Sequence, residues 1–179
     1  TTGEDVWYWD PSEDETIPAD RLTWFDNFDE AKPVDDCKKI IFSCSGGAVG
    51  VVRISDSKLL YYGHPNLNPH SVELLPGNRL VSASSSAASN NYAGKLRVFD
   101  IDTVSVYKKS IHGYNLYFGH NVVWDKTNEL LWATADTVLY AYSYNVDDGS
   151  LTLAETYDLP DGNSAAHDMF PDYGTTKLW

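Results

Sequence analysis

The sequence predicts an all-β fold, a β-propeller built from four-stranded antiparallel blades. The chain of 179 residues contains 6 Trp, 12 Tyr and 6 Phe, and aromatic side chains favour pleated sheet surfaces. Similar segments begin at His70, His120 and His167, which stand 50 and 47 residues apart. That period matches the roughly 40 to 50 residues of a propeller blade. We expect one propeller domain over residues 1–179, with about four blades, or part of a larger, seven-bladed ring.

A first unit lies before His70. The stretches "KKIIFSCSG", "AVGVVRISD" and "KLLYYG" are expected to form the second, third and fourth strands of one blade. Its inner strand is expected within "LTWFDNFDE". The next segment, "AKPVDD", is expected to be a loop, and Pro33 argues against a helix there. We expect no helix in the chain.

The next two units each begin with a histidine, a short apolar strand, a turn and a second apolar strand, as in "HSVELLPGNRLVSASSS" and "HNVVWDKTNELLWATAD". After His70, "GKLRVFDID" and "TVSVYKKSI" supply the third and fourth strands. After His120, "TVLYAYSYN" and "LTLAETYDL" supply them, joined by the Asp-Gly turn "VDDGS". Four alternating stretches per repeat are typical of a propeller blade.

The two ends of the chain carry partial units. "DVWYWDP" resembles a third strand, whereas "HDMFPDYGTTKLW" supplies a first and a second strand. These pieces predict either a fourth blade completed by pairing of the two ends, which would remove exposed sheet edges, or a blade left incomplete. If the natural ring is larger, the chain is a fragment or associates with a second copy to complete the ring.

The formal net charge of −13 excludes nucleic acid and anionic membrane surfaces as partners held by bulk electrostatic attraction. No apolar run approaches the roughly 18 residues of a membrane span. Cys37 and Cys44 are expected to be buried small hydrophobic residues that do not pair with each other. The glycines of "SCSGGAVG" lack the helix and lysine of a phosphate loop. No elbow motif marks a nucleophilic serine.

The segments "NPHSVELLPGNRLVSASS", "KLRVFDID", "GHNVVWD", "LLWATADTVLYAYSYN" and "AHDMFPDYGTTKLW" resemble a family of secreted propeller proteins of bacteria and fungi. That family resembles, more distantly, seven-bladed propeller polysaccharide lyases and rhamnosidases. The resemblance implies an extracellular protein that acts on uronate-containing glycans near the propeller axis. The chain is about three blades shorter than a seven-bladed member, which puts an active site built from the whole ring in doubt.

The three repeated histidines are the main candidate site. The first strand of each blade lines the central channel, so His70, His120 and His167 are expected to converge at one mouth. Converging neutral imidazoles can bind a divalent metal ion. One histidine near its ordinary pKa can instead transfer protons at neutral pH. The alternative is architectural: each histidine caps its strand by bonding a backbone carbonyl.

Further candidates surround this mouth. His64, Asn66 and Asn68 offer donors and acceptors for a sugar, or are ordinary turn residues. Arg53 is the candidate cation for a substrate carboxylate. Glu73 and Asp168 are candidate carboxylates for a metal ion or a proton. His112 is expected in a surface loop. The aromatic residues expected to be most accessible to sugars are Trp9, Trp24, Tyr92, Tyr114 and Tyr117.

Two functions follow from these features. In the first, the protein is a carbohydrate-active enzyme, in particular a lyase. One histidine takes the proton beside a uronate carboxylate, while a metal ion or a cationic side chain neutralises that carboxylate. In the second, the propeller is a non-catalytic scaffold that binds glycans or proteins on its faces.

Overall fold

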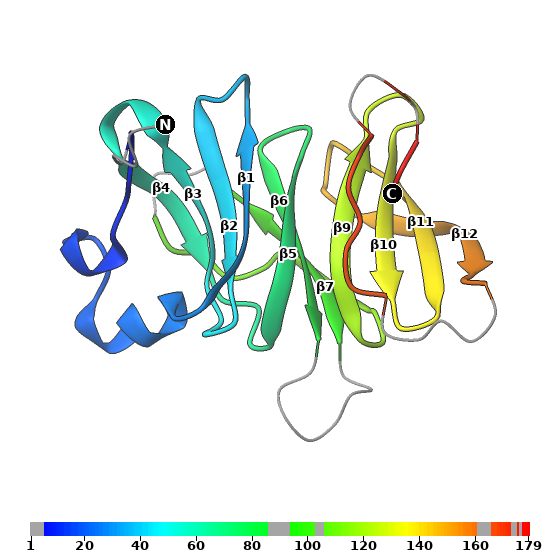
Figure 1. Ribbon diagram of the computed structural model, residues 1–179, viewed down its shortest axis with the longest axis horizontal. Coiled ribbons are helices and arrows are strands. Elements are labelled where there is room, and N and C mark those ends of the chain that lie inside the picture. The colour runs from blue at the N-terminus through cyan, green and yellow to red at the C-terminus, as the bar shows by residue number, and fades with distance from the viewer. Residues whose placement is uncertain (1–5, 86–93, 103–105, 161–165, 173–174, 176) are drawn as a thin grey trace.

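The computed structural model describes residues 6–85, 94–102, 106–160, 166–172, 175 and 177–179. Within these ranges the strands form three antiparallel sheets of four strands, each in sequence order, standing side by side like propeller blades (Figure 1). The first blade holds β1 (Phe28–Val34), β2 (Lys39–Cys44), β3 (Val49–Arg53) and β4 (Lys58–Gly63). The second holds β5 (Asn68–Leu75), β6 (Arg79–Ser85), β7 (Lys95–Asp100) and β8 (His112–Asn115). The third holds β9 (Gly119–Asp125), β10 (Leu130–Ala135), β11 (Val138–Tyr144) and β12 (Leu151–Asp158).

The core lies between the blades. Successive residues of a strand point to opposite faces of the sheet, so the middle blade is apolar on both sides. In β6, Leu80 packs with Ile41 and Tyr61 of the first blade, whereas its neighbour Val81 packs with Leu131 of the third blade. All five side chains are at most 1% exposed. The alternating apolar pattern therefore stacks the sheets face to face.

The first blade differs from expectation at its inner strand. The strand is Phe28–Val34, and it includes most of the segment expected to be a loop. Pro33 is tolerated because β1 is an edge strand of its sheet, where a missing backbone N–H leaves no ladder bond broken. The residues before it form the 3-10 helix η2 (Ala19–Phe25), so the expectation of no helix was wrong in this region.

The N-terminal segment covers the outer face of the first blade and forms no strand in the part described, Val6 onward. Trp9 packs against Phe25 and Phe42, with ring centroids 6.0 and 5.4 Å apart. The short 3-10 helix η1 (Pro11–Glu13) follows it, with Asp10 as the N-cap. The described part of "DVWYWDP" is therefore not a third strand: Trp9 packs on the first blade, whereas Trp7 and Tyr8 are exposed.

The fourth strand of the second blade is β8, and not the "TVSVYKKSI" segment. That segment instead links blades: the Tyr62 N–H donates to the Val106 carbonyl over 2.7 Å, and Tyr107 forms a parallel bridge with Tyr62. His112 therefore lies in β8, where its Nε2 contacts the Asp148 carbonyl at 2.9 Å. A third 3-10 helix, η3 (Ile54–Asp56), joins β3 to β4.

The C-terminal segment forms no full strand. Its described residues contain one isolated bridge, between Pro171 and Leu178. The described N-terminal residues lie beside the first blade, whereas the C-terminal segment lies beside the third (Figure 1). Among the described residues, the two ends do not pair into a fourth blade.

The two cysteines differ in burial. Cys44 is buried, and burial raises the pKa of its thiol. Cys37 is exposed in a turn, contrary to expectation, because the strand begins only at Lys39.

The helices among the described residues are all too short to span a membrane.

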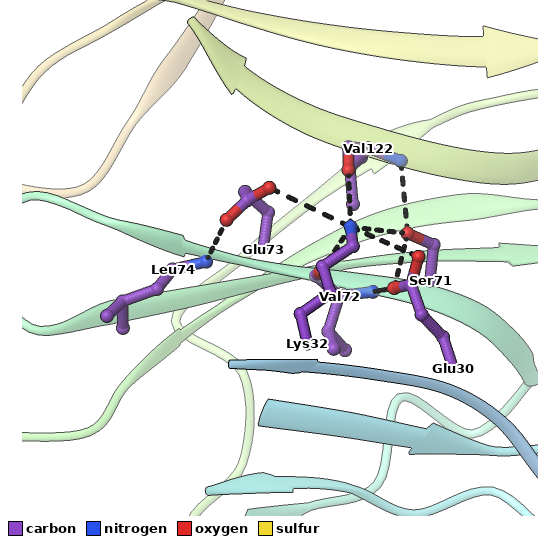
Figure 2. A network of polar contacts seen from close by, with 7 residues as sticks. All are labelled: Glu30, Lys32, Ser71, Val72, Glu73, Leu74 and Val122. Atoms are coloured by element: carbon purple, nitrogen blue, oxygen red, sulfur yellow. Dashed lines mark hydrogen bonds and ion pairs between the residues drawn. The ribbon is translucent and has the colours of Figure 1, made fainter. Parts of the chain in front are cut away.

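A polar network on the channel axis joins the inner strands of all three blades (Figure 2). The Lys32 ammonium of β1 lies 3.1 Å from Glu30 and 3.7 Å from Glu73 of β5. It also donates to the carbonyls of Val72 and Val122, each at 3.0 Å. Burial raises the pKa of Glu73, and the neighbouring ammonium opposes that rise.

Ser71 of β5 completes this network. Its hydroxyl donates to Glu30 at 2.8 Å and accepts the Val122 N–H at 3.2 Å. The Val72 N–H also donates to Glu30 at 2.9 Å. The Glu30 carboxylate of β1 is therefore hydrogen-bonded to β5, and Ser71 of β5 is hydrogen-bonded to β9.

Lys32→Met should destabilise the protein by about 3 kcal/mol, because it leaves two largely buried carboxylates without their cation. Urea unfolding followed by circular dichroism measures this. The matched control is Lys39→Met, which removes a more exposed pair with Asp35 and should cost less than about 1 kcal/mol. Equal effects of the two substitutions would contradict the role given to Lys32.

Candidate functional site

Each inner strand carries an irregularity at its entrance, and each irregularity releases one residue from the ladder. The register shifts pass over Asp29 in β1, His70 in β5 and His120 in β9. A bulge of this kind bends the strand and re-aims the side chain of the extra residue. The three blades therefore present Asp29, His70 and His120 at equivalent positions, where the inner strands begin; this end of the inner strands is called the mouth.

The structure brings the three repeated histidines together. The His70 and His120 rings are stacked, with centroids 4.4 Å apart and planes at 21°. His167 comes from the C-terminal segment, beyond the last blade, and its ring lies 4.3 Å from that of His120 and 6.1 Å from that of His70. His120 is buried at 3% exposure, whereas His167 is exposed. The buried His120 ring thus contacts both the partly exposed His70 ring and the exposed His167 ring.

His70 has the richest set of polar neighbours. Its Nε2 lies 2.8 Å from the Ser85 hydroxyl and 3.2 Å from the Asn68 amide nitrogen. Its Nδ1 faces Asp29, with 3.9 Å between Nδ1 and Oδ1. Because an amide nitrogen only donates, the amide as oriented here requires an unprotonated Nε2 and places the proton of the neutral ring on Nδ1. Ser45 in turn donates to the other Asp29 oxygen at 2.6 Å.

His120 is held by its own loop. Its Nδ1 lies 3.0 Å from the Phe118 carbonyl, and a carbonyl only accepts, so Nδ1 carries the proton. The Phe118 ring packs on the imidazole with centroids 4.3 Å apart. This contact is the carbonyl cap that the architectural interpretation expects.

Burial keeps these imidazoles neutral. It lowers the pKa of His70 to about 4, with a further lowering by His120 and His167, while Asp29 acts in the opposite direction. Burial is also the largest cause of the lowered pKa of His120. At neutral pH the mouth therefore offers unprotonated ring nitrogens as hydrogen-bond and proton acceptors.

The arrangement does not fit a three-histidine metal centre. Within the described ranges, no group of three or more His, Cys, Asp or Glu side chains is placed to hold a metal ion. The rings of His70 and His120 are stacked face to face, and ligand nitrogens must instead point at one centre.

Of the other candidates, Asn68 contacts His70, and the charge of Asp168 raises the pKa of His120 against the effect of burial. His64 packs on Trp24, with centroids 4.5 Å apart, and its Nδ1 accepts the Asn66 N–H at 2.9 Å. The pair therefore forms a turn against the first blade. Arg53 lies at the opposite end of β3 from the mouth, and it is held by Asp56 through contacts of 2.9 and 2.6 Å.

Most of the aromatic candidates pack against the apolar clusters of the blades. Trp9 and Trp24 belong to the apolar cover of the first blade, and Tyr114 packs on the core with its hydroxyl accepting the Leu151 N–H. Tyr117 is half-buried, and Tyr92 lies outside the described residues. Glu73 belongs to the axial network and Asp168 is exposed.

Asp29 and Ser85 are the site residues that sequence reasoning missed. Asp29 precedes Glu30 as His70 precedes Ser71, so aligning "DEAK" with "HSVE" would have found it. The misplaced inner strand of the first blade hid this alignment. Ser85 lies in a run of serines with no distinguishing motif.

A family model described as a family of unknown function (DUF6528) matches residues 1–179. No curated protein matches the chain.

Solved structures resemble the chain in fold. A putative 6-phosphogluconolactonase from Bacteroides fragilis is 14% identical, with a TM-score of 0.62 over 77% of this chain and 40% of its own. The WD40 domain of Toxoplasma gondii coronin is 12% identical, with a TM-score of 0.57 over 73% and 34%. Hydrazine synthase from Kuenenia stuttgartiensis is 16% identical, with a TM-score of 0.56 over 78% and 45%. The chain spans less than half the length of each, and WD40 repeats form propellers.

The lowered pKa of His70 predicts a pH dependence of stability. The unfolded residue titrates near its ordinary value of 6.5 and the folded one near 4, so the unfolded state binds more protons between these values. Stability should therefore fall as the pH falls from 6.5 to 4, by up to roughly 3 kcal/mol.

Urea unfolding at pH 7 and pH 4.5 checks this dependence. His70→Gln should reduce the fall between the two pH values, whereas the control His112→Gln, on β8, should keep it. A fall that is identical in the wild type and His70→Gln would contradict the assignment.

Proposed function

Because the chain belongs to DUF6528, a family of unknown function, we propose its function from the axial mouth: an extracellular carbohydrate-active propeller in which His70 accepts a proton at a bound sugar. The single observation that carries the proposal is the pair of contacts that Nε2 of His70 makes, with the Ser85 hydroxyl at 2.8 Å and the Asn68 amide at 3.2 Å. A neutral imidazole can accept a proton as a general base, and the pKa of about 4 that burial gives His70 makes it a weaker base than an ordinary histidine. His167, exposed on the outer side of the stack, offers a ring face to a sugar.

Elimination from a uronate is not the reaction that these residues support best. A lyase needs a cation beside the substrate carboxylate. Arg53 is bound to Asp56 at the far end of its strand, and Lys32 is neutralised by Glu30 and Glu73. The proposal therefore rests on general-base chemistry at a sugar, with elimination as one outcome of the test.

A non-catalytic glycan- or protein-binding scaffold is the second candidate. His120 favours it, because that buried ring bonds the Phe118 carbonyl and so has an architectural task. Binding without turnover of any tested sugar would select this candidate.

The test measures binding and turnover of neutral and uronate-containing oligosaccharides, by titration calorimetry and by chromatography of the products. His70→Gln should retain binding within about threefold and lose about a hundredfold in turnover, because it removes the proton acceptor but keeps a polar side chain. The remote control His112→Gln should match the wild type.

Two results would overturn the proposal. The first is the absence of binding to every sugar tested. The second is a stoichiometric divalent metal that disappears in His120→Ala, since this would establish the metal site that the ring arrangement does not fit.

A further inference from the structure

We propose that Ser85 is a nucleophile, with His70 as its base and Asp29 as the group that orients the base, so that the mouth catalyses acyl transfer from an ester or lactone. The inference deepens the proposed function and rests on it for the role of His70. It names the group from which His70 takes its proton and the class of bond that is cleaved.

The three side chains stand in the order that such chemistry requires. The Ser85 hydroxyl lies 2.8 Å from Nε2 of His70, and the opposite ring nitrogen faces Asp29 at 3.9 Å. A nucleophile within hydrogen-bond reach of a base, with a third group orienting that base, is the general signature of an activated serine. The first contact is at full hydrogen-bond distance. The second is looser, as catalytic contacts often are without substrate.

The tautomer agrees with this order. The Ser85 hydroxyl is the nearer of the two groups that contact Nε2, at 2.8 Å against 3.2 Å for the Asn68 amide nitrogen. With the ring proton on Nδ1, Nε2 accepts from this hydroxyl. The proton on Nδ1 then points toward the Asp29 carboxylate, which stabilises the imidazolium formed when Nε2 is protonated. The His70 and Asp29 side chains are 18% and 28% exposed, and Ser85 lies deeper, at 7% exposure.

The comparison between blades separates Ser85 from an ordinary strand-end serine. The same position in the first blade is Ser45, whose hydroxyl donates to the carboxylate of Asp29 and not to an imidazole. Within β6 itself, the neighbouring Ser84 hydroxyl is buried without a hydrogen-bond partner. Among these three serines, Ser85 is the one whose hydroxyl faces an imidazole.

The reaction is balanced with these groups and water. Ser85 Oγ attacks the carbonyl carbon while its proton passes to His70 Nε2, and the carbon–oxygen bond to the leaving alcohol breaks as that proton is returned to the alcohol. Water then attacks the acyl-serine, with His70 again taking and returning one proton. The products are the carboxylic acid and the alcohol, or the hydroxy acid from a lactone.

The first experiment treats the whole chain with an alkyl fluorophosphonate at pH 7.5 and locates the adduct by mass spectrometry. Phosphonylation should occur at one residue, Ser85, with loss of fluoride. The adduct should be absent in Ser85→Ala and form about a hundredfold more slowly in His70→Gln. Asp29→Asn should slow it by about tenfold or more, since it removes the charge that stabilises the imidazolium.

The matched control is Ser84→Ala, which removes the adjacent hydroxyl on the other face of β6 and should be labelled like the wild type. Circular dichroism of every variant establishes that it is folded. A second measurement, hydrolysis of a p-nitrophenyl ester and of an aldonolactone, should show the same order of rates among the variants.

The outcomes separate this inference from the function it rests on. No adduct at Ser85, or labelling unchanged in folded His70→Gln, overturns the nucleophile while leaving sugar binding and turnover to be judged by their own test. An adduct at Ser85 that depends on His70, in a protein that binds no sugar, supports the nucleophile and overturns the carbohydrate proposal.

Discussion

The Lys32 ammonium is the interaction on which the arrangement of the three blades depends. Apolar side chains hold neighbouring blades together in pairs, but such contacts are non-directional and allow sliding. The ammonium instead bonds carbonyls of β5 and β9 while paired with carboxylates of β1 and β5. Hydrogen bonds of this kind demand defined geometry. The hydrogen bonds of Lys32 therefore fix the position of each inner strand along the axis. As a result, the first residues of β1, β5 and β9 lie at the same height.

The candidate site is a consequence of this alignment and of the bulges. Without a bulge, the side chain at each entrance would follow the alternation of its strand. With the bulge, Asp29, His70 and His120 lie outside the pairing register, and the aligned strands bring them within contact of one another. Burial among the neighbouring imidazoles then keeps His70 neutral. Position and protonation state thus have one structural origin.

The sequence predicted the parts of the fold that are encoded locally. Alternation and turn residues identified the strands around Ile41, Val51, Leu80 and Val98, and the repeated histidine predicted the propeller. Two kinds of information were not local. The inner strand of the first blade contains Pro33 and lacks the histidine, so only its pairing with β2 reveals it. Ser85 and His70 are brought together by the pairing of β5 with β6, and Asp29 comes from the first blade. The spacing of these residues in the sequence therefore does not predict that they are close.

The bulges also bear on how such a mouth can change. A bulged residue has no partner on the neighbouring strand. The choice of amino acid there is therefore constrained by the side chains around the mouth more than by the sheet. The first blade has a carboxylate where the other two have imidazoles, and the sheets remain alike. Single substitutions at these points could exchange acid, base and neutral groups around the opening while the supporting blades stay intact. The architecture thereby separates the evolution of chemistry from the maintenance of the scaffold.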